Sequence, residues 1–299
     1  MDNRNVFVAI ALSMAVLLFW GAFFETPRQV KENQTLNNTQ TNQNETQTDI
    51  TPNINQERVV KKISRKDALT ENDRIIIENE KLKGSISLKG AIFDDLSFKN
   101  YKKDLMSEES VVLLNPKDID DGYFIESGWA SVGNEVEVPG IDTLWQVKGN
   151  RVLSEKNDVV LEWNNGKGLI FKKTIKLDEK YLFKIKQEVK NNTSSKINLY
   201  PYSQITRNKK PDDVMGFYIL HEGFIGVFDG ELKEDDYDDI KDKKIVRNSD
   251  NGWLGITDKY WVTAIVPPKG KNFKSTFLYK DNYRANYILN SPVTINPKS

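Results

Sequence analysis

The sequence predicts an all-β domain, built as an antiparallel sandwich, that follows one transmembrane helix. Three observations lead to this prediction. An uncharged apolar run of 19 residues lies near the N-terminus, and a polar tract follows it from Gln29 to Gln56. Beyond about Val59 the chain consists of short apolar or alternating runs of 4 to 9 residues, separated by Gly, Asn, Asp and Pro. That alternation is typical of strands and turns, and the helical period is nearly absent there.

The apolar run extends from Val6 to Phe24 and is long enough to cross a bilayer once. As a helix it spans about 28 Å, against a hydrocarbon core about 30 Å thick. A cleavable signal peptide is the alternative, but its apolar region is shorter and ends in a small-x-small site. The closing residues Phe19–Phe24 contain no such site. We therefore expect an uncleaved anchor whose aromatic residues lie at the membrane interface. Residues of this anchor are Val6, Leu12, Leu17, Trp20 and Phe24.

The flanks of the anchor leave its orientation open, because Arg4 with the α-amino group stands on one side and Arg28 with Lys31 on the other. No second apolar run of this length follows Phe24. The tract dominated by Asn, Gln and Thr has too few apolar side chains to offset the entropy of ordering, so we expect a disordered tether. The expected organisation is the N-terminus and anchor over residues 1–28, a linker over 29–58 and a β-sandwich, expected to be incomplete at its C-terminal end, over 59–299.

Thirteen segments beyond the linker carry the strand pattern. They are Arg74–Glu78, Gly84–Leu88, Val111–Leu114, Glu135–Val138, Asp158–Trp163, Leu169–Lys176, Tyr181–Val189, Ile197–Ile205, Phe224–Phe228, Gly252–Thr257, Tyr260–Val266, Lys274–Leu278 and Ala285–Leu289. So many short strands indicate a large sandwich with one or two short helices.

Turns between these segments favour an antiparallel meander over βαβ units. Asn164-Asn165-Gly166 is typical of a tight hairpin, because Asn and Gly accept positive φ. Leu177–Lys180 and Asn191–Ser195 are further expected turns. The densely charged stretch Glu231–Lys244 indicates a solvated loop or a short helix.

Composition excludes several classes of function. The 43 Lys+Arg residues balance 43 Asp+Glu residues, so the broad electropositive surface of nucleic-acid binding is missing. The absence of cysteine excludes disulfides, Cys-zinc sites, iron–sulfur clusters and thiol nucleophiles. A single histidine, His221, excludes metal sites built from two or three histidines. We expect no catalytic residue, no metal and no cofactor.

Two features of the sequence allow a chemical interpretation, but a simpler one is favoured for each. His221-Glu222 could serve as an acid/base pair in a sugar-active sandwich, but a lone histidine is more often a surface or hydrogen-bonded residue. The tryptophans could line a sugar or peptide groove, although core packing is favoured; they are Trp129, Trp145, Trp163, Trp253 and Trp261.

Adjacent carboxylate pairs would point to opposite faces of a strand, so they are expected in turns. These pairs are Asp94-Asp95, Asp120-Asp121 and Asp212-Asp213.

Three segments resemble the YidC membrane protein insertases of Gram-negative bacteria. The opening Met1–Asn5, with Asp2 and Arg4, precedes an apolar run that contains Trp20 and a polar linker. Asn79–Leu96, which includes Gly90, is similar to that family's first periplasmic strands. Asn251–Pro267 resembles its Gly-Trp strand pair ending at a proline, and its motif positions here are Gly252, Trp253 and Pro267.

The resemblance implies a β-supersandwich like that of galactose mutarotases, with a cytoplasmic N-terminus and a periplasmic domain at the bacterial inner membrane. It further implies that this chain is the N-terminal part of a non-enzymatic insertase, whose insertion groove lies in five further transmembrane helices that this chain lacks. The implied partners are nascent membrane proteins, the Sec translocon with its accessory subunits, and the lipid bilayer. Binding at a sheet edge or groove would be the domain's own contribution.

Two other interpretations remain open at this point. One is a membrane-tethered carbohydrate-binding or mutarotase-like protein, motivated by the sandwich, the aromatic residues and His221-Glu222. The other is an inert structural spacer.

Overall fold

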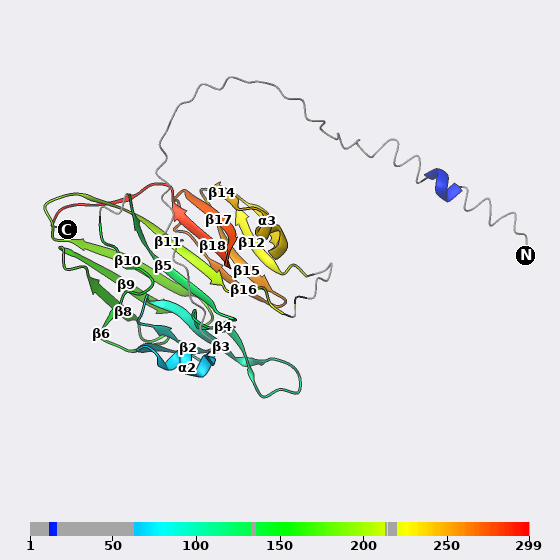
Figure 1. Ribbon diagram of the computed structural model, residues 1–299, viewed down its shortest axis with the longest axis horizontal. Helices are drawn as coiled ribbons and strands as arrows, with labels where there is room; N and C mark the ends of the chain where they lie inside the picture. Colours follow the sequence, from blue (N-terminus) through cyan, green and yellow to red (C-terminus); the bar gives the residue numbers. More distant parts are fainter. Residues whose placement is uncertain (1–11, 17–62, 133–135, 213, 215–219, 299) are drawn as a thin grey trace, which may run out of the picture. The chain divides into compact units, whose positions relative to one another are not determined.

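The computed structural model describes residues 12–16, 63–132, 136–212, 214 and 220–298 (Figure 1). Residues 12–16 are helical with exposed side chains, and Leu12 is among them. No helix within the described ranges has the length and apolar character needed to cross a bilayer. The other expected anchor and N-terminal motif positions lie outside the described residues, as does the polar tract; they are Asp2, Arg4, Val6, Leu17, Trp20 and Phe24.

The described residues of the domain form one large and two small sheets. The large sheet has 11 strands in the order β14-β17-β18-β11-β5-β3-β2-β1-β7, with β19 paired to β11 and β4 paired to β3. Its strands are β1 (Arg74–Glu78), β2 (Leu82–Ser87), β3 (Ile92–Lys102), β4 (Ser110–Leu114), β5 (Tyr123–Ser131), β7 (Val152–Leu153), β11 (Ile197–Arg207), β14 (Ile245–Ser249), β17 (Phe273–Lys280), β18 (Asn282–Leu289) and β19 (Val293–Ile295).

Two four-stranded sheets form the second layer, in the orders β10-β9-β8-β6 and β13-β12-β15-β16. The first contains β6 (Gln146–Lys148), β8 (Val159–Asn164), β9 (Leu169–Leu177) and β10 (Phe183–Asn191). The second contains β12 (Gly223–Phe228), β13 (Glu231–Asp236), β15 (Gly252–Asp258) and β16 (Trp261–Ile265). Two short helices complete the described domain, α2 (Arg65–Thr70) and α3 (Tyr237–Asp242).

Aromatic contacts join each small sheet to the large one. Trp129 of β5 meets Phe171 of β9 edge to face, with ring centroids 5.1 Å apart. Phe224 of β12 packs against Phe277 of β17 at 5.0 Å. These rings belong to one continuous cluster of buried residues, so a single core holds both small sheets against the large sheet.

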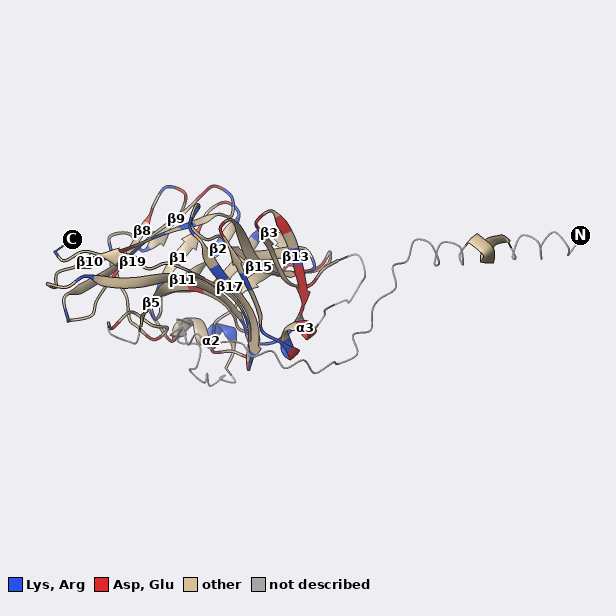
Figure 2. Ribbon diagram, turned by 90° about the horizontal axis from the view of Figure 1, so that it is seen from above, with Lys and Arg blue, Asp and Glu red and all other residues tan. Residues whose placement is uncertain are grey.

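The predicted all-β, antiparallel architecture is confirmed, since the strand pairs of the described residues are antiparallel apart from the short parallel pair β1–β7. The Asn164–Gly166 hairpin is also confirmed, joining β8 to β9 with Gly166 at φ 70°. Within Glu231–Lys244 the expected short helix is α3, while β13 precedes it and was not expected. Acidic side chains gather on β13 and α3 (Figure 2).

One expected strand is wrong. Residues 136–138 of the Glu135–Val138 segment pair with no other strand, and Glu135 lies outside the described residues. Val136 and Val138 still pack against the core, which accounts for their apolar alternation. Pro139 follows them and has no N–H to donate to a ladder.

The expectation of a turn at Asp94-Asp95 is also wrong, because both residues lie inside β3. A β-bulge there pairs Ser85 with Asp95 and Ile86 with Phe93, so Asp94 is the extra residue. Arg74 forms an ion pair with Asp94, and Arg65 forms one with Asp95. The bulge and these arginines allow two adjacent carboxylates in a strand. Asp120-Asp121 lies in a turn as expected, and so does Asp212, while Asp213 is not described.

Candidate functional site

An apolar cleft of about 510 Å³ lies where the two small sheets leave part of the large sheet uncovered. Its floor comes from β2, β3, β4, β5, β11 and β18 of the large sheet. Its two walls come from β10 of one small sheet and β16 of the other. The cleft therefore follows from the division of the second layer into two sheets.

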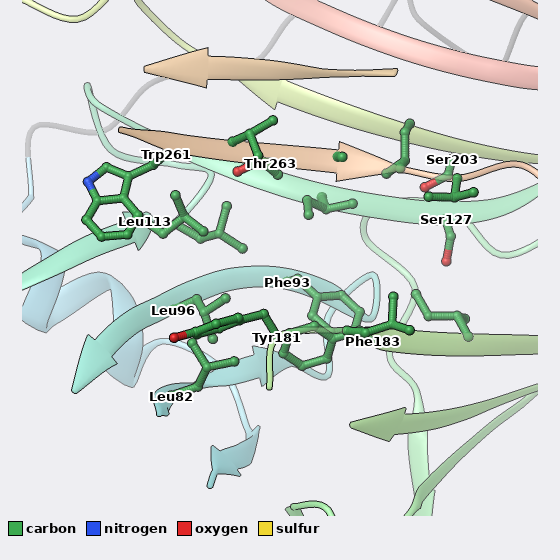
Figure 3. Close-up of a pocket in the computed structure, with 18 of the residues that line it drawn as sticks. Leu82, Phe93, Leu96, Leu113, Ser127, Tyr181, Phe183, Ser203, Trp261 and Thr263 are labelled. Atoms are coloured by element: carbon green, nitrogen blue, oxygen red, sulfur yellow. The ribbon is translucent and has the colours of Figure 1, made fainter. Parts of the chain in front are cut away.

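Figure 3 shows how the lining side chains face one another. Leu82, Phe93, Leu96, Tyr181 and Phe183 gather on one side of the cleft. Trp261, Leu113 and Thr263 lie on the opposite side.

Stacked aromatic rings border one end of the cleft. The rings of Phe98 and Trp261 are stacked with centroids 4.4 Å apart, and this contact bridges β3 and β16. Tyr101 meets Trp261 edge to face at 4.9 Å, and Tyr181 meets Phe98 at 5.8 Å. Of these rings, Tyr101 and Tyr181 are 46% and 43% exposed to solvent. Such rings present apolar area with a polar tip, which suits binding of another molecule.

Both walls are edge strands. β10 pairs only with β9, and β16 pairs only with β15, among the residues that the structure describes. Each therefore keeps one row of backbone N–H and C=O groups outside its sheet, and such a row is a template for a further strand. On β16 the side chains alternate, with Thr263 and Ile265 buried and Val262 and Ala264 exposed.

Two polar groups in the lining donate to the domain's own backbone, whereas the buried hydroxyl of Thr263 has no hydrogen-bond partner among the described residues. Gln187 Nε2 donates to Gly128 O at 2.9 Å, and Ser203 Oγ donates to Glu126 O at 2.9 Å. Burial raises the pKa of Tyr287, which also lines the cleft, to about 12. No carboxylate, lysine or histidine is among the lining residues of the described chain. The site is therefore suited to holding apolar groups.

A buried lysine lies in the adjoining core. Lys173 of β9 is 2% exposed, and its Nζ donates to the backbone O of Ser127 at 2.6 Å. The ammonium lies 4.8 Å from the centroid of the Trp145 ring. Burial lowers the pKa of Lys173 to about 7, and the charge of Glu126 opposes this shift only in part.

His221 and Glu222 lie outside the cleft lining. His221 Nε2 is 2.8 Å from the backbone O of Phe224, and Nδ1 is 3.4 Å from a carboxylate oxygen of Asp236. The simpler interpretation of a hydrogen-bonded histidine is thus confirmed. Among the described residues no group of three His, Asp or Glu side chains is arranged to hold a metal ion.

The tryptophans divide between the core and the cleft. Trp129 and Trp145 are buried and stack with centroids 6.4 Å apart, and Trp163 packs partly buried against the same core. Trp261 lines the cleft. Trp253 is half-buried in β15, opposite Val227 of β12.

The described motif positions have structural roles. Gly90 lies in the β2–β3 turn at φ 79°, and a Cβ there would be 2.4 Å from Ile141 O. Gly252 has φ 141°, and a Cβ there would be 1.8 Å from Val227 O. Pro267 is buried just beyond β16.

The predicted strands include the two walls and the floor strands β2, β4, β11 and β18, but β3 and β5 of the floor were missed. Ile125 and Ser127 come from β5, and Phe93 and Leu96 come from β3, and neither strand was expected. One feature of the sequence could have indicated the cleft. Both faces of Tyr260–Val266 carry apolar residues, among them Trp261, Val262 and Val266. A strand with one face in a core and the other in solvent would alternate more clearly.

Comparison with known proteins gives a consistent result. The family described as the YidC periplasmic domain matches residues 74–299. The protein named membrane protein insertase YidC from Pelagibacter ubique is 45% identical over 300 residues, covering 100% of this chain and 53% of that protein. Proteins of the same name from Jannaschia sp. and Sinorhizobium medicae are 36% and 35% identical, covering 93% and 99% of this chain. This chain spans about half the length of these relatives, 47% and 52% in the latter two.

Among solved structures, a galactose mutarotase related enzyme from Lactobacillus acidophilus is similar with a TM-score of 0.44 and 10% identity. The match covers 76% of this chain and 94% of that one.

Proposed function

Because this chain belongs to the YidC family, we propose that it is the N-terminal part of a membrane protein insertase that helps integral membrane proteins insert and fold. The observation that carries the proposal is the family match over residues 74–299. Relatives named membrane protein insertase support it, because their alignments cover 100% and 99% of this chain. The proposed role is non-enzymatic.

The proposed topology places residues 6–24 across the bacterial inner membrane, with the N-terminus in the cytoplasm. The matched family is described as a periplasmic domain, which supports a periplasmic location for residues 59–299. Residues 29–58 would then tether the domain to its anchor. The proposed partners of the whole protein are nascent membrane proteins, the bilayer and the Sec translocon with its accessory subunits.

Within this assignment, the cleft holds an extended apolar segment of a client. Hydrophobic segments of an unfinished membrane protein need shelter from water, since exposed apolar area is unfavourable at about 25 cal/mol per Å². A lining dominated by Phe, Leu, Ile, Val and Trp provides it. The volume of about 510 Å³ suits a few side chains of such a segment and excludes a whole helix.

The unpaired edges of β10 and β16 bind the backbone of the client. An extended chain has its own row of N–H and C=O groups, which must be paired once they leave water. A strand lying along β10 or β16 pairs those groups, while its alternate side chains point down to the floor. Binding through the backbone tolerates many sequences, as a client-binding site must.

The sugar-active alternative is not favoured. His221 lies outside the cleft and its ring nitrogens already face Phe224 O and Asp236. Two of the polar lining groups, Gln187 and Ser203, are also bonded to the domain's own backbone, and most of the remaining lining is apolar. A mutarotation assay tests this directly, and we expect the wild type and His221→Ala both to match the uncatalysed rate.

The proposal is tested by exchanging halves between relatives. Residues 1–299 replace the matching part of the Sinorhizobium medicae insertase, to which this chain is 35% identical. The chimera is expressed in cells whose own insertase can be depleted, and insertion of reporter membrane proteins is followed by protease protection. We expect insertion to persist after depletion.

In a matched control, the S. medicae insertase keeps its own N-terminal anchor and its C-terminal half but has no periplasmic domain. Loss of insertion in cells where the chimera accumulates in the membrane, at the level of the intact insertase, would contradict the proposal. Chimera activity equal to that of the anchor-only control would favour the inert-spacer interpretation for the periplasmic domain.

A further inference from the structure

The loop between β3 and β4 presents a second apolar surface. Leu105 and Met106 are adjacent at its tip, and their exposed fractions, 104% and 95%, are the highest among the exposed apolar residues of the described chain. Figure 1 shows this loop extending away from the sheets. Two large apolar side chains held fully in water at a protruding tip indicate a surface that contacts something else.

Part of the loop's backbone is hydrogen-bonded within the loop. Lys103 N donates to Glu109 O at 3.0 Å, and Ser107 N donates to Asp104 O at 3.3 Å. Met106 N donates to a side-chain oxygen of Asp104 at 2.9 Å. These bonds matter because unpaired backbone groups are costly away from water, so each internal bond lowers the cost of bringing the tip to the edge of an apolar phase.

Residues at the base of the loop and in the cleft lining are of the kind found at the membrane–water interface. Tyr101, near the end of β3, and Tyr260, next in sequence to Trp261, both line the cleft and are 46% and 76% exposed. Tyrosine rings sit at the level of lipid headgroups, with the ring toward the chains and the hydroxyl in water. Lys102 and Lys103 flank the tip, with their side chains paired to Glu108 and Glu109 and still half-exposed. Lysines in such places extend their ammonium groups to the headgroups.

We propose that this loop inserts Leu105 and Met106 into the headgroup region of the lipid bilayer, so that the mouth of the cleft lies at the membrane surface. The shape of the site favours lipid over protein. A convex tip with two side chains cannot enclose a peptide, and the concave cleft beside it is the site that can. A bilayer surface accepts a convex apolar tip without a matching pocket.

The predicted anchor and linker make such a shallow contact sufficient, and the inference rests on that part of the proposed function. The composition of the 28 residues from Gln29 to Gln56 predicts a flexible tether, which would have an end-to-end distance of roughly 30 Å. Such a tether would keep the domain close to the bilayer, and the high effective concentration would strengthen a weak contact. An extended segment emerging from the membrane would then meet the cleft within a short distance.

The chain contains no cysteine, which allows one fluorophore to be placed at will. Met106→Cys in the full chain is labelled with an environment-sensitive dye and reconstituted in vesicles of phosphatidylethanolamine and phosphatidylglycerol. A fraction of the lipids carries a nitroxide quencher on the acyl chain close to the headgroup. Val246→Cys on β14 serves as the matched control, because Val246 is also an exposed apolar residue, at 45%.

We expect the nitroxide lipids to reduce the emission of the Met106 label roughly twofold or more, as for a side chain at the acyl boundary. The Val246 label should keep its emission. Leu105→Cys should behave as Met106→Cys does, and neither substitution threatens folding, because both side chains are in solvent.

Emission at position 106 that is unchanged by the nitroxide lipids would overturn the inference. A blue shift without quenching would overturn it as well, since it would mean that the tip contacts protein, such as a second copy of this chain. Either failure leaves the chimera experiment untouched, so the inference can fail while the proposed function stands.

Discussion

Replacing Lys173 by methionine should stabilise the domain at neutral and acidic pH. The side chain is fully buried beside Trp129 and Trp145, and Ser127 O is the acceptor for its Nζ. In the unfolded chain this amine has its ordinary pKa of 10.5, and in the folded domain burial lowers the pKa to about 7. Folding therefore requires the loss of a proton below pH 10.5, or the burial of a charge.

The magnitude follows from the shift. A difference of about 3.5 units at about 1.4 kcal/mol per unit is a penalty of roughly 5 kcal/mol. Between pH 7 and pH 10.5 the unfolded chain binds more protons at this site than the folded domain, so stability rises with pH. The penalty is complete below about pH 7 and is relieved as the pH approaches 10.5. Methionine removes it but leaves Ser127 O without a donor, at a cost of roughly 1–3 kcal/mol. The net gain at pH 6 should be roughly 2–4 kcal/mol.

The assay is urea unfolding of the full chain in a mild detergent, followed by tryptophan fluorescence from pH 6 to pH 9.5. The difference in unfolding free energy between Lys173→Met and wild type is compared at each pH, because the contributions of the other titrating groups cancel in this difference. Lys172→Met is the matched control, because Lys172 is the neighbour on the other face of β9 and is 43% exposed. We expect that variant to stay within about 0.5 kcal/mol of wild type at every pH. A stability difference for Lys173→Met that does not fall as the pH rises would refute the reasoning.

Two further predictions concern the fold. Arg74→Met leaves the buried carboxylate of Asp94 without its ion-pair partner and should cost roughly 3–5 kcal/mol in urea unfolding, while the double variant with Asp94→Leu recovers most of the loss. Equal losses in the single and double variants would contradict this. Gly252→Ala places a Cβ 1.8 Å from Val227 O and should cost roughly 3 kcal/mol or more. Gly166→Ala, also at positive φ but in open space, should cost only about 1–2 kcal/mol, and similar losses at both glycines would show that φ alone decides.

Local sequence was sufficient where a strand carries its own period and turn. Arg74–Glu78 was predicted with the bounds that β1 has, and Asn164–Gly166 marked the hairpin that joins β8 to β9. In both places the neighbours along the chain decide the conformation, since alternation sets the buried face and Asn-Gly sets the turn.

Longer-range partners explain the strands that were missed. The carboxylates of Asp94 and Asp95 disfavour a strand locally, and arginines from β1 and α2 make them acceptable in β3. In β5 the polar run Glu126–Gly128 interrupts the apolar pattern. The whole of β5 nevertheless pairs with β11, and this pairing keeps the run in a strand. Propensity gives way to tertiary pairing at such positions.

The cleft could not be predicted for a related reason. Alternation showed that Phe183 and Ile185 share one face of a strand, and the same holds for Trp261 and Thr263. It gave no indication that the two strands end separate sheets and border a common gap. Sheet membership depends on hydrogen bonds between distant segments, and a single sequence does not display them.

The most direct test of the central claim is a binding measurement with the cleft filled. Ile185 lines the cleft on β10, and Lys186 is exposed on the opposite face of the same strand. The full chain in lipid nanodiscs is titrated against a short fluorescent peptide that alternates leucine and threonine. Fluorescence anisotropy is recorded for the wild type, for Ile185→Trp and for the matched control Lys186→Trp.

We predict saturable binding that Ile185→Trp weakens about tenfold or more, a loss of about 1.4 kcal/mol, and that Lys186→Trp leaves unchanged. A peptide with N-methyl groups on alternate backbone nitrogens, which cannot donate to an edge strand, should bind as weakly as the cleft-filled variant binds the plain peptide. Equal affinities for the wild type and Ile185→Trp would contradict the assignment of the cleft as the client-binding site.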